Sequence, residues 1–272
     1  LPLIPVSQLF EVARGERRGW NLMFYPTSEH EIEPEYLQPV VKNPSNLKGY
    51  LGTPDMQAFC CSLTEEELSA EGADGALAWI ERFRHGTNNS GVPLTESLAR
   101  ANMRWYEMKA ETRADLALLL NPNLRLFFSR FSEPTFVDQR LVRFSAKEGN
   151  DLNLSTALLN TSISYLMVEG NGFGRGLGVL DLSATSLKKH LHMLDPSILT
   201  ADQRNNIVSL YEPLLSRDVE DVADELERAD RQAFDKAVLE AYNINTPLRE
   251  VYDALLRLVE IRQTVLVDYS DD

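Results

Sequence analysis

The chain has 272 residues, 43% of them apolar and 25% charged, which is the composition of an ordinary globular protein with a sizeable core. It contains no apolar run of the roughly 18 residues that a membrane span needs and no signal-peptide pattern at its start. These features exclude a membrane protein and lead us to expect a soluble, cytoplasmic one. The net charge of −14 excludes a uniformly basic surface for binding nucleic acid.

The charge is unevenly distributed along the chain. Residues 200–272 contain 17 acidic and 8 basic residues, so most of the excess negative charge lies there. Residues 100–150 contain 9 basic and 6 acidic residues. A local basic surface outside the C-terminal part is therefore compatible with the acidic total.

The first distinctive segment reads "ARGERRGWNLMFYP". Gly15 and Gly19 bracket Arg17 and Arg18, and Trp20 follows directly. Guanidinium groups on a glycine-bordered turn suit contact with phosphate or guanine. The alternative is a surface turn with Trp20 tucked into the core.

Four segments are predicted strands because they are rich in apolar and β-branched residues and are bounded by turn residues. They are "LMFYP" (22–26), "LRLFFSRF" (124–131), "TFVDQRLVRF" (135–144) and "GVLDL" (178–182).

The segment "TFVDQRLVRF", taken as one strand, carries four polar side chains of interest. Strand alternation places Asp138 and Arg140 on one face, and Gln139 and Arg143 on the other. Gln139 is chemically suited to adenine and Arg140 to guanine. Alternatively, both are simply polar residues at the edge of a sheet.

Five glycines alternate in "GNGFGRGLG" (170–178), after a predicted helix with Leu159, Ile163 and Leu166 on one face and Asp151 or Asn153 as its N-cap. The third glycine of a G-x-G-x-x-G motif is missing, and the order of helix, glycines and strand is the reverse of a phosphate loop. We therefore expect a structural turn, with no cofactor site.

Metal and catalytic motifs are absent from the sequence. Cys60 and Cys61 are the only cysteines and are expected to be reduced and structural. His190 and His192 have no accompanying cluster of metal ligands, so no metal site is expected. The sequence shows no nucleophile elbow, P-loop or zinc-protease motif.

The C-terminal part is predicted to form three amphipathic helices, one of which presents Ala229, Ala233 and Ala237 on its apolar face. Pro196 separates the helical pattern from the strand-rich one. We expect an α+β protein in which a mixed, strand-rich domain (1–198) is followed by an amphipathic helical tail (199–272) that packs on it or on a partner.

Three segments resemble, in this order, the C-terminal target-recognition region of adenine-specific DNA methyltransferases from restriction-modification systems, including fused restriction and modification enzymes. They are "GERRGWNLMF", "LLNTSISYLMVEGNGFGRGLGVLDLSATSLKKHLHMLDP" and "ADRQAFDKAVLEAYNINTPLREVYDALLRLVEIR". Residues 50–100 match nothing in that family. The N-P-P-Y-type catalytic tetrapeptide is also absent, because "NPNL" lacks its second proline and its aromatic residue.

The resemblance implies a bacterial-type, sequence-specific recognition domain for double-stranded DNA that does not transfer a methyl group by itself. S-adenosylmethionine and catalysis would belong to a methyltransferase domain upstream in the same polypeptide, as the start at Leu1 without methionine also leads us to expect. Side chains would position the DNA backbone and read base edges. The residues expected to contact DNA are Arg17, Arg18, Trp20, Gln139, Arg140, Arg143 and Arg175.

Two other functions are compatible with the sequence. One is a protein-interaction module whose acidic helical tail docks another subunit. The other is an enzyme whose active site is assembled from residues that form no recognisable motif.

Overall fold

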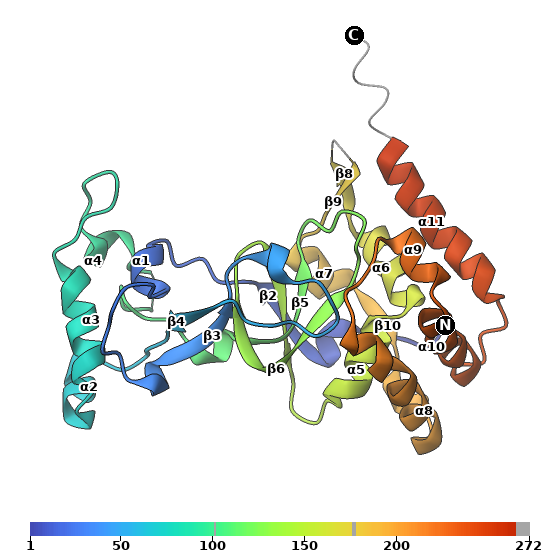
Figure 1. Cartoon of the computed structure of the whole chain (residues 1–272), viewed down its shortest axis with the longest axis horizontal. Coiled ribbons are helices and arrows are strands. Elements are labelled where there is room, and N and C mark those ends of the chain that lie inside the picture. Colours follow the sequence, from blue (N-terminus) through green and yellow to red (C-terminus); the bar gives the residue numbers. More distant parts are fainter. Residues whose placement is uncertain (101, 176–177, 265–272) are drawn as a thin grey trace, which may run out of the picture.

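A six-stranded sheet lies between two groups of helices in the computed structural model (Figure 1). Helices α1 to α4 lie at one end of the long axis, and α5, α6 and α8 to α11 lie at the other. The structure describes residues 1–100, 102–175 and 178–264; of Arg175 it describes the backbone alone. This combination of a mixed sheet and a helical C-terminal part confirms the expected α+β class.

The bounds of the elements are as follows. The strands are β1 (Leu3–Pro5), β2 (Phe10–Arg14), β3 (Leu37–Val41), β4 (Met56–Phe59), β5 (Ala114–Leu119), β6 (Phe128–Val137), β7 (Leu141–Ala146), β8 (Phe173–Arg175), β9 (Val179–Asp181) and β10 (His192–Leu194). The helices are α1 (Asn21–Phe24), α2 (Glu65–Glu71), α3 (Asp74–Arg84), α4 (Leu94–Ser97), α5 (Leu152–Leu159), α6 (Ser162–Asn171), α7 (Ala184–His190), α8 (Ala201–Tyr211), α9 (Val222–Glu227), α10 (Ala229–Ala241) and α11 (Leu248–Thr264).

The strand order in the large sheet is β2-β7-β5-β6-β3-β4. β3 and β6 run parallel, and the other neighbouring strands are antiparallel. Two smaller pairs, β1 with β10 and β8 with β9, are also antiparallel. The sheet therefore pairs β2 with β7 and β3 with β6, whose partner residues lie at least 96 residues further along the chain.

Two hydrophobic cores meet at the β3–β6 pair. Successive side chains of a strand point to opposite faces, and here the two faces belong to different cores. Val40 and its neighbour Phe136 lie in one core, while Val41 and its neighbour Val137 lie in the other. Residues 50–100, to which the sequence assigned no role, supply α2 to α4 and much of the smaller core.

Three of the predicted elements were wrong. "LMFYP" mostly lies in the short helix α1, and the helix predicted before the glycines is divided at Asn160 into α5, which Asp151 caps, and α6, which Thr161 caps. "TFVDQRLVRF" is two strands, β6 and β7, because residues 138–140 form a turn between them.

Helix α8 packs against α5 and α11 packs against α6, while α9 and α10 pack on the other tail helices, and all four share the larger core with the sheet. The predicted apolar face of α10 was wrong in part, since Ala229 and Ala233 are exposed. Arg231, Phe234 and Asp235 are buried instead. The pattern of apolar residues could not predict this buried face of α10, because the two residues at its centre, Arg231 and Asp235, are charged and form an ion pair. Within the described residues, no helix is both long and apolar enough to cross a membrane.

The ion pair on α10 is the centre of a buried polar network. Arg231 Nε donates to Asp235 Oδ2 at 2.9 Å, and Arg231 Nη1 donates to the hydroxyl of Tyr50 at 3.1 Å. Asp235 also accepts from the Ser162 backbone N–H and the Tyr252 hydroxyl, both at 3.0 Å. The network thus links α10 to α6, to α11 and to the loop between β3 and β4.

Replacing Asp235 with alanine should destabilise the chain by about 3–5 kcal/mol, because it leaves the fully buried Arg231 without its carboxylate. The matched control is Lys236→Ala, at an exposed position on the same helix, which should change stability by less than about 0.5 kcal/mol. Denaturant unfolding of both variants measures the difference. Equal stabilities would contradict this account of the network.

Candidate nucleic-acid interface

The segment after β2 runs directly beside the turn between β6 and β7. The Gly15 N–H donates to the Leu141 carbonyl at 2.9 Å, and the Glu16 N–H donates to the Val137 carbonyl at 2.7 Å. A Cβ atom on Gly15 would lie 2.2 Å from the carbonyl oxygen of Asp138, so only glycine permits this approach. The first glycine of the arginine turn is therefore needed for backbone packing.

This contact brings Arg14, Lys42 and Arg140 together around Asp138 and Gln139, and the exposed Arg17 follows directly after the bonded Glu16. We call these four cations the basic cluster. Arg14 is exposed, and its Nε donates to the Gln139 carbonyl at 2.7 Å. Arg140 is also exposed, and its Nη2 donates to the Lys42 carbonyl at 3.0 Å. Arg17 is exposed and, within the described residues, its side chain has no hydrogen-bond or ion-pair partner.

Asp138 is the buried acid that organises the cluster. Its carboxylate accepts from Arg140 Nε at 2.7 Å and from Lys42 Nζ at 2.8 Å, and it is only 3% exposed. Burial by itself would raise the pKa of Asp138, but the hydrogen bonds from Arg140 and Lys42 outweigh burial and hold the pKa below its ordinary value. Three acids lie at the cluster: Asp138, the half-buried Glu16, and Asp55, whose carboxylate accepts from the Lys42 backbone N–H at 2.7 Å. Four cations against three acids leave a small excess of positive charge.

The turn itself follows from the chemistry of Asp138. Its side chain accepts from the Arg140 N–H at 3.1 Å, and its carbonyl accepts from the Leu141 N–H at 2.9 Å. An aspartate that bonds the backbone two residues ahead favours a turn over a continuing strand. The turn exposes Arg140 and leaves Gln139 half-exposed beside it.

The structure corrects the expectation for Arg18. Its side chain is 2% exposed, Nη2 donates to the Trp105 carbonyl at 2.9 Å, and the guanidinium carbon lies 4.7 Å from the centre of the Phe24 ring. Burial and the nearby charge of Arg100 lower the pKa of Arg18 to about 10. In this conformation the buried guanidinium of Arg18 is out of reach of a DNA phosphate, and its Nε and Nη1 have no hydrogen-bond partner among the described residues.

The other expected residues lie apart from the basic cluster or outside the described residues. Trp20 is half-buried against the smaller core. Arg143 lies further along β7, beside Ala13, and its Nη1 donates to Ser145 Oγ at 3.0 Å. The side chain of Arg175 is outside the described residues, so its contact with DNA stays a prediction, as do the contacts of Trp20 and Arg143.

The sequence analysis missed Arg14 and Lys42. Arg14 belongs to the arginine-rich segment "ARGERRGWNLMFYP". It is the last residue of the edge strand β2, and this position next to Gly15 is the signal that could have indicated it. Lys42 carries no such signal, because its neighbour Asp138 lies 96 residues away in the chain.

The glycine-rich segment forms the hairpin β8–β9. Arg262 of α11 links this hairpin to α6. Its Nη1 donates to the Gly178 carbonyl, and its Nη2 donates to Glu169 Oε1 at 3.0 Å. A Cβ atom on Gly172 would lie 2.3 Å from the side chain of Leu180. Gly172 is thus needed for packing, and Gly178 adopts a positive φ of 69° that favours glycine, whereas a Cβ atom on Gly174 would meet only the side chain of Arg262, at 3.9 Å.

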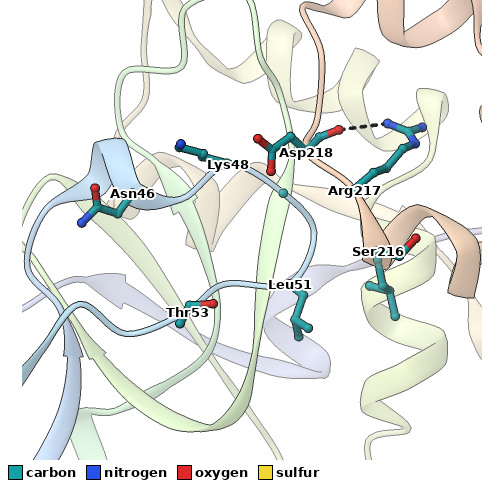
Figure 2. A pocket seen from close by; sticks show the side chains of 9 residues that line it. Asn46, Lys48, Leu51, Thr53, Ser216, Arg217 and Asp218 are labelled. Carbon is teal, nitrogen blue, oxygen red and sulfur yellow. Dashed lines mark hydrogen bonds between the residues drawn. The ribbon is translucent and has the colours of Figure 1, made fainter.

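A polar pocket of 520 Å³ lies beside the loop of residues 42–55 (Figure 2). Lys48 and Thr53 line it from that loop, and Ser216, Arg217 and Asp218 line it from the segment before α9. Arg217 is occupied by two hydrogen bonds of 2.8 Å to the buried Glu225. The pocket is lined by no histidine or cysteine. Among the described residues, no group of three metal-binding side chains comes together.

The solved structures that share this fold include two restriction enzymes. The type IIG restriction endonuclease BpuSI matches 97% of this chain and 32% of its own length, with a TM-score of 0.64 and 11% identity. The type IIL restriction-modification enzyme MmeI, solved in complex with DNA, matches 96% of this chain and 36% of its own length, with a TM-score of 0.56 and 14% identity. The chain thus spans about a third of either enzyme. No protein-family model and no curated protein matches it.

Replacing Asp138 with asparagine should cost about 1.5–3 kcal/mol at neutral pH, because two charge-assisted hydrogen bonds are weakened. The lowered pKa of Asp138 means that its ionised form stabilises the fold above the unfolded pKa of about 3.9, and that this stabilisation is lost as the pH falls through the folded pKa. The difference in the free energy of unfolding between the wild type and Asp138→Asn should therefore shrink below about pH 4. Unfolding measurements from pH 7 to pH 3 test this, and a difference independent of pH would contradict it.

Proposed function

We propose that the chain binds double-stranded DNA and selects the target site for a restriction-modification enzyme that methylates adenine. The observation that carries this proposal is the basic cluster. Arg14, Arg17, Lys42 and Arg140 come from three separate segments of an acidic protein and lie together at one end of a sheet.

The cluster has the chemistry that a DNA backbone requires. Arg17 offers a free guanidinium, and guanidinium groups bind phosphate through two parallel hydrogen bonds. Arg140 is held by Asp138, so its orientation is set before DNA arrives. Gln139, in the same turn, would lie within reach of a base edge.

The fold likeness supports this proposal, because the two matching structures are a restriction endonuclease and a restriction-modification enzyme, and the second is solved with DNA. Methyl transfer would belong to another domain, which supplies S-adenosylmethionine and the opposite wall of the DNA-binding cleft. The described residues of this chain would position the duplex and leave the reaction to that domain.

The competing proposal, a tail that docks another subunit, has less support from the packing. The tail helices bury Ile207, Phe234 and Leu255 in the core that they share with the sheet. Their acidic outer faces carry ion pairs such as Arg249 with Asp253, at 2.9 Å. The tail helices are therefore part of the hydrophobic core of this chain, and burying their apolar faces does not require another subunit.

Duplex binding should weaken with salt, with a slope of log affinity against log salt of about −0.9 for each phosphate contacted. Arg17→Gln should reduce that slope by about 0.9. The matched control is Arg257→Gln on α11, an exposed arginine whose side chain has no partner within the described residues. Titration of a labelled 30-base-pair duplex at several salt concentrations measures all three slopes.

Two results would count against the proposed function. One is no duplex binding at low salt, either by the chain alone or with a methyltransferase domain restored upstream. The other is an equal loss of slope in Arg17→Gln and Arg257→Gln, since a general charge effect would then explain the binding.

A further inference from the structure

Two hollows next to the basic cluster share one exposed side chain, that of Asn121. The first, of 430 Å³, is lined by residues that include Arg14, Asn121 and Asp181. The second, of 290 Å³, is lined by residues that include Asn121, Arg125 and Asp221. Asn121 therefore lies between the two hollows, which together we call the trough.

The backbone next to Asn121 is tied to the basic cluster. The Leu120 N–H donates to the Arg140 carbonyl at 3.0 Å, and the Leu120 carbonyl accepts from the Leu182 N–H at 2.8 Å. Asn121 follows directly and is exposed. A duplex whose backbone lies on the basic cluster would thus present its bases near this side chain.

Asp181 fixes the orientation of the Asn121 amide. Asn121 Nδ2 donates to Asp181 Oδ1 at 2.8 Å. Because a carboxylate accepts hydrogen bonds and does not donate them, the amide nitrogen must face Asp181. The Asn121 carbonyl oxygen and the second N–H then remain available for a ligand. One acceptor beside one donor is the pattern that pairs with N6–H and N7 of adenine in the major groove.

The rest of the trough is mixed in charge. Arg125 is suited to guanine, and Asp221 is suited to the amino group of cytosine. A surface that only held phosphates would be uniformly basic. Donors and acceptors of both signs in one trough fit the edges of base pairs better.

We propose that Asn121 is a specificity-determining residue that reads an adenine in the major groove, and that Asp181 is its positioning residue. This inference rests on the proposed function, because the basic cluster must first hold the DNA backbone. The proposal adds the place where the DNA sequence is read. That place lies in the loop between β5 and β6, which contains none of the residues that the amino-acid sequence led us to expect at the DNA.

The test starts from a pool of 30-base-pair duplexes with a randomised centre, from which the wild-type chain enriches its preferred sequence. Each base pair of that sequence is then replaced in turn. At one adenine the replacement should weaken wild-type binding about tenfold to a hundredfold, the usual value of a two-bond contact. Asn121→Ala should lose this preference at that base pair alone and keep the salt slope of the wild type. Asp181→Asn should relax the preference at the same base pair, which a purely structural role would not do.

The matched control is Asn206→Ala, at an exposed position on α8 that lines neither hollow, and it should leave every preference unchanged. The inference is overturned if Asn121→Ala keeps all the wild-type preferences, or if the wild type binds duplex DNA without preference for sequence. In both cases duplex binding that depends on Arg17 would still stand. If the wild type does not bind duplex DNA either alone or with a methyltransferase domain restored upstream, the proposed function fails and the inference fails with it. Thermal melting of both trough variants separates a loss of preference from a loss of folding.

Discussion

The close backbone contact between Gly15 and the 138–140 turn is the constraint on which the interface depends. A side chain at position 15 would collide with the Asp138 carbonyl, so the contact exists only because the residue is glycine. Across this contact the end of β2 meets the end of β6 and the start of β7. Arg14 and Arg17 are thereby placed beside Gln139 and Arg140, more than 120 residues later in the chain.

The structure separates two kinds of arginine in an acidic protein. Arg18, Arg231 and Arg262 are buried. Their guanidinium groups donate to carbonyls, carboxylates or a tyrosine hydroxyl inside the protein, so these side chains are not available on its surface. Arg17 and Arg140 are exposed at a turn. The local basic surface therefore depends on where exposed cations cluster and is compatible with the net charge of −14. The arginines proposed to bind DNA are those whose side chains are exposed and not buried in the core.

The fold class and the helical C-terminal part could be predicted because periodic apolar residues such as Ile207, Val251 and Leu255 mark buried helix faces. The face of α10 could not, because it is centred on the Arg231–Asp235 ion pair, which a hydrophobic pattern counts as polar. The break between β6 and β7 depends on one aspartate that bonds its own turn. The break between α5 and α6 falls at Asn160, whose amide bonds the Phe128 backbone. Each of these features depends on hydrogen bonds to distant residues or on local side-chain chemistry.

The candidate site was predicted in part. Arg17, Gln139 and Arg140 could be chosen from residue type and local context, but their proximity depends on strand pairing, which a single sequence does not show. The sequence alone could not show that Arg18 turns inward while its neighbour Arg17 stays exposed. Asn121 was noted as part of a failed catalytic motif, and only the fold places it beside Asp181, 60 residues later.

Photo-crosslinking tests the central claim most directly, since it reports which surface of the chain lies against DNA. A photoreactive side chain at position 139, next to the basic cluster, should crosslink to a bound duplex. The same group at position 206, on the exposed face of α8, should not. Crosslinking at position 206 with none at position 139 would contradict the account, because the duplex would then lie on a different surface of the protein.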